Sequence, residues 1–212
     1  MQHEFVLTPK ELYFLGSIFR ARYIDYAYIS AMDDIQKRYQ LHRREALRHL
    51  TELGLLREDF TGEITVSAPL QQALRPVFFG PTETVIQLYQ ARNARINTWR
   101  LHHLEGRSTM VTMGNDRLYL RAAEAADIDQ LIRELTPVSA TVAPTRPLER
   151  EYVRHMVTVR QATVGSPAHE EIWLEQDGLL FRDGPDPEMT YLTSGQFAEH
   201  MGEILKGEFI WA

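Results

Sequence analysis

The chain has 212 residues, of which 44% are hydrophobic and 25% charged, a composition typical of a globular protein with a sizeable core. Its 23 basic and 29 acidic residues give a net charge of −6, which argues against a protein whose whole surface contacts nucleic acid. The absence of cysteine excludes disulfides, thiolate catalysis and Cys-based metal sites, so a reduced cytoplasm is the expected compartment.

The first twenty residues predict an amphipathic helix. Thr8 to Glu11 form a capping box with Pro9 in the first turn, and apolar residues follow at helical spacing to about Arg20. Charged residues interrupt the apolar run and no basic stretch precedes it. We therefore expect neither a signal peptide nor membrane insertion.

Residues 1–80 have the element order of a winged-helix-like unit. A glycine stop ends the third helix, and turn residues separate two short extended pieces after it. We expect this unit to pack against the rest of the chain through Leu50, Leu53 and Leu55. After the first helix, the predicted elements are helices at 31–39, 42–53 and 67–75 and a hairpin around Thr61-Gly62.

From residue 81 the periodicity changes from the helical one to the alternation that is typical of strands. Short turns, among them Asn115-Asp116, suit antiparallel hairpins. An apolar stripe then predicts a helix from Ala125 to Leu135. The first strand-rich repeat therefore covers residues 81–136, with strands at 84–92, 96–106, 107–113 and 116–122.

A stretch rich in proline and small polar residues, 137–147, has linker composition. Beyond it, residues 148–212 repeat the order strand, turn, strand and helix, with Asp177-Gly178 at the turn and one added strand, "EMTYLTS". This duplication predicts a single α+β domain with a quasi-two-fold arrangement around one central antiparallel sheet.

No recognised catalytic or phosphate-binding motif is present. The adjacent pair His102-His103 would point to opposite faces of a strand and could not easily share an ion. Asp127 and Asp129 stand at the start of a predicted helix, where acidic side chains are favoured by the exposed amides. We therefore expect no enzyme activity, no cofactor and no metal site.

A local basic cluster keeps a DNA-binding alternative open. Arg43, Arg44 and Arg48 lie where a winged-helix regulator places its groove-reading side chains. The predicted wing reads "REDFTGE", however, and its acidic side chains would repel phosphate. Nucleic acid is therefore not the favoured partner, and a winged-helix transcription regulator with a C-terminal dimerisation or ligand module is the alternative hypothesis.

The order of elements resembles the EspG family of type VII secretion chaperones. The resemblance rests on "LTPKELYFLGSIF", "ALRHLTELGLL", the hairpin after it, "APLQQALRP", "TVIQLYQAR" and "GRSTMVTMGNDRLYLRAAEAADIDQLIREL". Because the chain is short, it is more similar to the EspG-like chaperones encoded with type VII systems of firmicutes. The resemblance implies a quasi-two-fold fold with a central antiparallel sheet and flanking helices, and neither catalysis nor a cofactor.

The resemblance also implies a cytoplasmic chaperone that keeps a secreted client, a toxin or a small helical partner, soluble and delivers it for export. Such a role requires an exposed apolar patch with aromatic anchors. Trp99 and Trp173 on predicted strands are candidates, as are Phe209 and Trp211 in the terminal "GEFIWA". Each of the four has an alternative role in the core of the chain itself. No pattern in the sequence indicates an oligomeric state.

Overall fold

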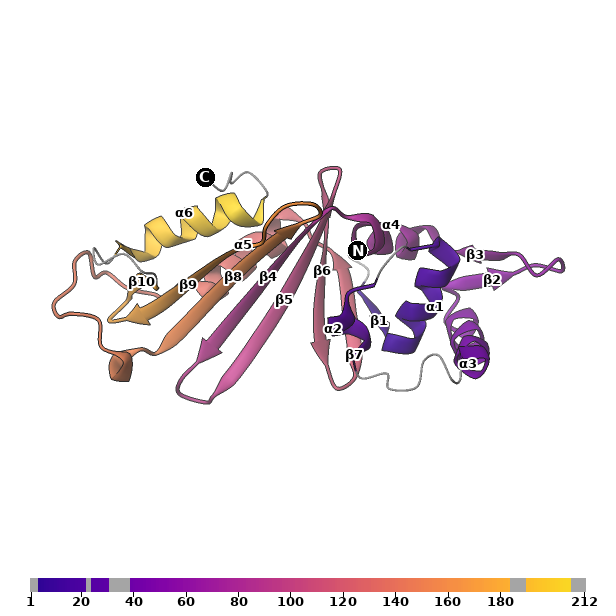
Figure 1. Ribbon diagram of the computed structural model, residues 1–212, viewed down its shortest axis with the longest axis horizontal. Helices are drawn as coiled ribbons and strands as arrows, with labels where there is room; N and C mark the ends of the chain where they lie inside the picture. The colour runs from indigo at the N-terminus through magenta and orange to yellow at the C-terminus, as the bar shows by residue number, and fades with distance from the viewer. Residues whose placement is uncertain (1–3, 22–23, 31–38, 184–189, 207–212) are drawn as a thin grey trace. The chain divides into compact units, whose positions relative to one another are not determined.

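The computed structural model describes residues 4–21, 24–30, 39–183 and 190–206 (Figure 1). Its helices are α1 (Pro9–Phe19), α2 (Tyr26–Ile29), α3 (Tyr39–Glu52), α4 (Ala68–Phe79), α5 (Ala125–Leu135), the 3-10 helix η1 (Arg150–Tyr152) and α6 (Ser194–Leu205). Its strands are β1 (Phe5–Leu7), β2 (Leu56–Glu58), β3 (Ile64–Val66), β4 (Thr82–Gln90), β5 (Arg95–Leu104), β6 (Arg107–Gly114), β7 (Arg117–Ala122), β8 (His155–Thr163), β9 (His169–Gln176), β10 (Leu179–Asp183) and β11 (Tyr191–Leu192).

The contacts divide the chain into two compact units. Unit 1 comprises residues 1–81 and 102–122, and unit 2 comprises residues 82–101 and 123–212. This division differs from the predicted segments, because strand β5 contributes its first residues to unit 2 and its last to unit 1. In the part of the chain that the structure describes, no helix has both the length and the apolar character to cross a membrane.

Helix α1 of unit 1 begins at the predicted capping box. The Thr8 side chain accepts a hydrogen bond from the Glu11 amide at 3.2 Å, and the Glu11 carboxylate accepts one from the Thr8 amide at 2.7 Å. The helix ends at Phe19, and Arg20 adopts a left-handed conformation. The predicted second helix at 31–39 falls almost wholly outside the described residues; Tyr39 belongs to α3, and the short α2 was not predicted.

The leucines expected to anchor the helical unit behave differently from one another. Leu50 is fully buried and Leu55 packs against the core of unit 1. Leu53 is 52% exposed, so its predicted packing role is wrong. The reason is local: α3 ends at Glu52, and the turn at Gly54, with a positive φ, breaks the helical spacing that placed Leu53 beside Leu50.

Helix α4 is longer than predicted. The sequence indicated an end at Arg75 because Pro76 follows, but α4 continues through Pro76 to Phe79. Val77 and Phe78 in this last turn are buried in the core of unit 1, so their packing holds the turn in place.

The predicted hairpin at Thr61-Gly62 is confirmed, since β2 and β3 pair from Leu56↔Val66 to Glu58↔Ile64.

The main sheet has the strand order β1-β7-β6-β5-β4-β8-β9-β10-β11. Strands β4 and β8 form its central pair, antiparallel from Thr82↔Thr163 to Gln90↔His155. On either side of this pair the strands follow in chain order, β4 to β7 and β8 to β11, and each set is followed by a helix, α5 or α6. This order confirms the predicted quasi-two-fold organisation around a central antiparallel sheet, although β1 and β8 were not themselves predicted.

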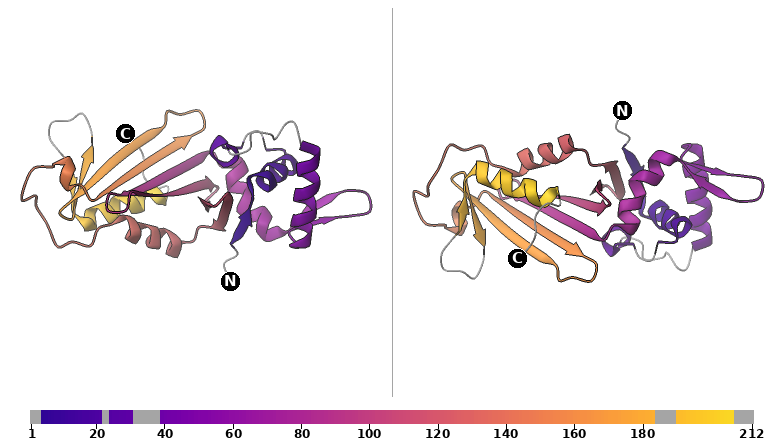
Figure 2. Two further views of the ribbon diagram at one scale, coloured as in Figure 1. Left: turned by 90° about the horizontal axis from the view of Figure 1, so that it is seen from below. Right: turned by 90° about the horizontal axis from the view of Figure 1, so that it is seen from above.

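Two helices cover one face of the sheet in unit 2 (Figures 1 and 2). Helix α5 has the predicted bounds and buries Ile128, Leu131, Ile132 and Leu135. Helix α6 buries Phe197, Met201, Ile204 and Leu205. The two helices pack side by side, and a Cβ added to Gly202 of α6 would be 3.8 Å from the Ile132 side chain of α5.

The stretch predicted as a linker is irregular but anchored. Arg146 donates two hydrogen bonds to the Asp177 carboxylate, at 2.8 and 2.9 Å, and the Gln176 side chain donates to the Pro147 carbonyl at 2.9 Å. Ser139 lies against Gly178, where an added Cβ would be 2.0 Å from the Ser139 hydroxyl. Residues 137–149 therefore form a strap fastened to the β9–β10 turn, within unit 2.

Candidate functional site

The sheet of unit 2 has two chemically distinct faces. On β4, the alternate residues Thr84, Ile86 and Leu88 are buried beneath the helices. The intervening residues Val85, Gln87 and Tyr89 are exposed or half-buried. Strands β8 and β9 alternate in the same way. We call the side under α5 and α6 the helix face and the opposite side, which carries Val85, Tyr89, Met156, Thr158, Ile172 and Leu174, the open face (Figure 2).

The strand register aligns apolar side chains across the open face. Successive register partners run Tyr89↔Met156, Met156↔Leu174, Leu174↔Phe181 and Phe181↔Tyr191. The rings of the last pair lie 6.0 Å apart between centroids. Directly opposed side chains on one face are in contact range, so the pairs form a continuous line. With Ile96 of β5, these residues make up the apolar row: Ile96, Tyr89, Met156, Leu174, Phe181 and Tyr191. Phe181 is only 3% exposed, so the accessible surface of the row comes from the other five side chains.

A hydrogen bond shows which way the residues of β5 point. Arg100 donates to the Glu83 carboxylate at 2.6 Å, and Glu83 shares the open face with Val85 by alternation. Arg100 therefore points to the open face, as does Ile96 four residues earlier, with 60% of its surface exposed. Trp99, next to Arg100, points to the helix face and is half-buried.

Trp173 belongs to the core of unit 2. It is 2% exposed, and its ring packs edge-on against Phe197 at 5.7 Å and His200 at 5.5 Å. Because so little of the indole is exposed, we interpret Trp173 as a core residue of unit 2 rather than as a contact for a partner. Phe209 and Trp211 lie outside the described residues. Of the two candidates that the structure describes, Trp99 and Trp173, neither lies on the open face.

The side chains of the apolar row were missed because their alignment depends on register. The sequence shows alternation within each strand, but the pairing of β4 with β8 joins residues more than sixty positions apart in the chain. Alternation within each strand was the available signal. It places Tyr89 and Leu88 on opposite faces of the sheet, and likewise Met156 and Val157. Alternation assigns each residue to a face, but it does not show which residues of neighbouring strands are register partners.

The charged side chains of the open face lie beside the apolar row and not within it, and Asp183, the register partner of Ile172, is one of them. The Glu83–Arg100 ion pair lies at the other end of the open face, and Arg160 and Glu170 are register partners at the same end. Thr158 and Gln87 stand between the charged end and the row. An apolar strip without charge beside a polar margin is the composition of a protein–protein interface rather than of a catalytic centre.

A buried carboxylate fastens α6 to the helix face. Glu171 accepts hydrogen bonds from His200 at 2.7 Å, from Trp173 at 3.1 Å and from Arg182 at 3.0 Å. Burial raises the pKa of Glu171, but the bonds from His200 and Trp173 and the charge of Arg182 outweigh it and hold the pKa below its usual range. The anion therefore ties β9, β10 and α6 together beneath the apolar row.

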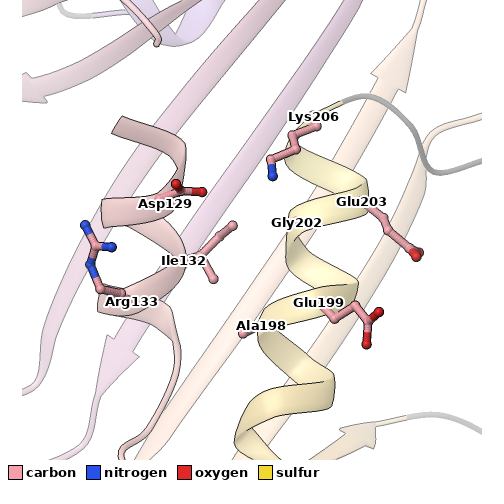
Figure 3. A pocket seen from close by; sticks show the side chains of 8 residues that line it. All are labelled: Asp129, Ile132, Arg133, Ala198, Glu199, Gly202, Glu203 and Lys206. Atoms are coloured by element: carbon pink, nitrogen blue, oxygen red, sulfur yellow. The ribbon is translucent and has the colours of Figure 1, made fainter. Parts of the chain in front are cut away.

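The groove between α5 and α6 is a weaker candidate (Figure 3). It has a volume of about 540 Å³, and Ile132, Ala198 and Gly202 form its floor. The other five lining residues carry charges of both signs: Asp129, Arg133, Glu199, Glu203 and Lys206. Binding pockets are predominantly apolar with few polar groups, and this groove has the opposite balance.

The basic cluster on α3 is a solvent-exposed helix face. Arg43, Arg44 and Arg48 are exposed, and Arg48 lies 3.9 Å from Glu52 at the spacing of an ordinary surface pair. His49 on the same helix pairs with the buried Glu11 of α1. Among the residues that the structure describes, no three His, Asp or Glu side chains are grouped so as to hold a metal ion.

His102 and His103 on β5 point to opposite faces of the strand, as alternation predicts. His102 is buried and pairs with the hydroxyl of Tyr28 at 2.5 Å, whereas His103 pairs with the Ser108 hydroxyl at 2.8 Å. Burial lowers the pKa of His103. Each ring therefore has its own local partner in unit 1, which explains both residues structurally.

No protein-family model matches the sequence, and neither does any curated protein. In fold, the chain is similar to the type VII secretion system chaperone EspG5 of Mycobacterium tuberculosis, solved in complex with the PE25–PPE41 dimer. The likeness covers 96% of each chain with a TM-score of 0.59 and 8% sequence identity. At this identity the likeness shows the fold alone. The expected EspG-like fold is confirmed, and membership of the firmicute type stays a prediction.

Proposed function

We propose that this chain is a cytoplasmic chaperone of a type VII secretion system, which binds a secreted helical client on the apolar row and keeps it soluble until export. The observation that carries the proposal is the EspG-like fold, which extends over 96% of the chain. The solved protein that shares this fold, EspG5, is a chaperone in complex with a dimeric partner. The client of the present chain is a toxin or a small helical secretion partner.

The dimensions of the apolar row suit a helix. The row crosses six neighbouring strands, β5 to β11 in the sheet order, and five strand spacings of about 4.8 Å make it about 24 Å long. A helix rises 1.5 Å per residue, so about 16 residues would cover the row. An amphipathic helix that lays its apolar side on the row would bury the half-exposed side chains of Tyr89, Met156 and Leu174.

The proposed role requires no reaction. Binding removes apolar surface of both partners from water, and that burial supplies the affinity. The polar end of the open face, with Glu83 and Arg100 already paired, would lie at the rim and set the orientation of the client. We therefore propose a non-catalytic protein without a cofactor.

The test begins with purification of the chain from its native cytoplasm and identification of any stoichiometric secreted partner. Met156→Asp places a charge in the middle of the apolar row, and we expect it to weaken client binding more than about tenfold, as truncated interface anchors do. Gln87→Asp is the matched control, because it introduces the same charge on the same face outside the row. It should leave the affinity within about threefold of the wild type.

Three results would count against the proposal. Equal affinity of Met156→Asp and Gln87→Asp would remove the apolar row as the site. The absence of any secreted partner, together with salt-sensitive binding to duplex DNA, would favour the transcription regulator instead. Substitution of Arg43, Arg44 and Arg48 by Glu separates the two roles, because it would abolish DNA binding and leave client binding unchanged.

A further inference from the structure

The hairpin β2–β3 of unit 1 presents an aromatic ring at its tip. Phe60 is 100% exposed, and every residue from Arg57 to Glu63 is exposed with it. The hairpin extends outward from the helices of its unit (Figure 1). Leaving a phenylalanine ring in water forgoes about 1.5 to 3 kcal/mol relative to burying it. Because Phe60 is fully exposed, no described residue of unit 1 buries the ring.

The turn around Phe60 is held rigidly. The Asp59 carboxylate accepts hydrogen bonds from the Thr61 amide at 2.8 Å, the Thr61 hydroxyl at 2.6 Å and the Glu63 amide at 3.0 Å. Two backbone bonds close the same turn, from Asp59 N to Glu63 O at 3.0 Å and from Gly62 N to Asp59 O at 3.1 Å. These bonds fix the backbone on both sides of Phe60 without using its side chain.

The base of the hairpin is fixed in the core of unit 1. Leu56 is buried, and Ile64 and Val66 pack against the same core. The Ser67 amide also donates to the Leu55 carbonyl at 2.9 Å. Phe60 is therefore an exposed ring on a support that is ordered before any partner arrives, which reduces the entropy lost on binding.

The surroundings of the ring are acidic. Glu58, Asp59 and Glu63 flank it, against the single cation Arg57. The hydrogen bond from the Thr61 side chain, with those from the backbone of Glu63 and Thr61, lowers the pKa of Asp59, so this carboxylate stays ionised. Such a rim repels nucleic acid, anionic lipid and an identical tip of a second copy. The same carboxylates would attract lysine and arginine side chains on the surface of a partner.

We infer that the β2–β3 tip is a docking finger for a folded partner protein. Phe60 enters an apolar pocket on that protein, and the carboxylates around it meet a basic rim of the pocket. The finger belongs to unit 1 and the apolar row to unit 2. The partner that we infer for the finger is a second protein besides the proposed client. The inference stands without the proposed function, because it uses only the geometry and charge of the hairpin.

The test combines crosslinking with measured affinity. A photoreactive benzophenone analogue of phenylalanine replaces Phe60 in the native host, and the same analogue at Thr65, exposed on β3, is the control. The protein crosslinked at 60 is identified, purified and titrated against the intact chain. We expect Phe60→Ser to weaken that complex about 30-fold or more, as loss of an interface anchor does. Glu58→Lys with Glu63→Lys should weaken it about tenfold, and more at low salt than at high salt.

Each other outcome overturns the inference. Equal crosslinking at 60 and 65, or a purified partner whose affinity is the same for Phe60→Ser, means that the tip is not a docking site. Crosslinking to a second copy of the chain, checked by sedimentation, assigns the tip to self-association. Phe60-dependent binding to vesicles of phosphatidylcholine and phosphatidylglycerol assigns it to a membrane. Client binding by Phe60→Ser stays at the wild-type level in all cases, so a failure here is distinguishable from failure of the proposed function.

Discussion

The two faces of the unit 2 sheet contain similar side chains in different circumstances. On the helix face, Val157 and Trp173 are buried, and Trp173 packs against Phe197 of α6. On the open face, their immediate neighbours in sequence, Met156 and Leu174, are half-buried and aligned across the strands. One step along a strand therefore separates the core from the candidate binding surface. The position of a residue in the alternation along its strand, and not its hydrophobicity, therefore assigns an apolar side chain to the core or to the candidate binding surface.

The largest expected effect comes from removing Trp173, a buried side chain of the helix face. We expect Trp173→Ala to lower the free energy of unfolding by about 3 to 5 kcal/mol, because it leaves a cavity under α6 and takes a donor from Glu171. Leu174→Ala, one residue along, is the matched control and should cost less than half as much. Equal losses in urea denaturation would show that the two faces do not differ.

A second substitution probes the strap. Gly178 has a φ of +84° and faces Ser139, whereas Gly165 has a φ of +83° with open space around it. Alanine at Gly165 should cost about 1 kcal/mol for the left-handed backbone alone. Alanine at Gly178 should cost about 2 to 3 kcal/mol, because the strap must also move. Thermal unfolding of the two variants measures the difference, and similar values would mean that the strap is not held at this turn.

The buried carboxylate of Glu171 makes the stability of the helix face depend on pH. Its pKa is lower in the folded chain than in the unfolded one, so its contribution is complete above about pH 4.3 and is lost as the pH falls through the folded pKa. We expect Glu171→Gln to cost about 2 kcal/mol at pH 7. Below about pH 4.3 its stability should fall less steeply than that of the wild type. Parallel curves in denaturation at graded pH would contradict this assignment.

The open face should tolerate change best. Ile96→Thr replaces an exposed apolar side chain at one end of the apolar row with a β-branched polar one. We expect the free energy of unfolding to stay within about 0.5 kcal/mol of the wild type, as for most surface substitutions. Affinity for the proposed client should nevertheless fall a few-fold, measured by calorimetry. A large loss of stability would place Ile96 in the core instead.

Local chemistry explains which parts of the fold were predictable. Helix α5 has its predicted bounds, and the predicted turns at Asn115-Asp116 and Asp177-Gly178 have the positive φ values that such residues allow. At Pro76, packing of the last turn of α4 overrides the local preference for ending the helix. At Leu53, the helix ends one residue earlier than predicted, so the helical spacing no longer applies. The apolar row was not predicted, because it exists only after strands of different repeats have paired.

The central β4–β8 pair also sets an order of events during synthesis. Ile96 and Tyr89 precede Met156 by some sixty residues or more, and the row ends at Tyr191. Contacts of such sequence separation form late, since a long loop must close before they can be made. A nascent chain that has emerged only through β7 holds two of the six row residues. The apolar row is therefore assembled only after translation has passed Tyr191, so a shorter nascent chain cannot present this surface to a partner.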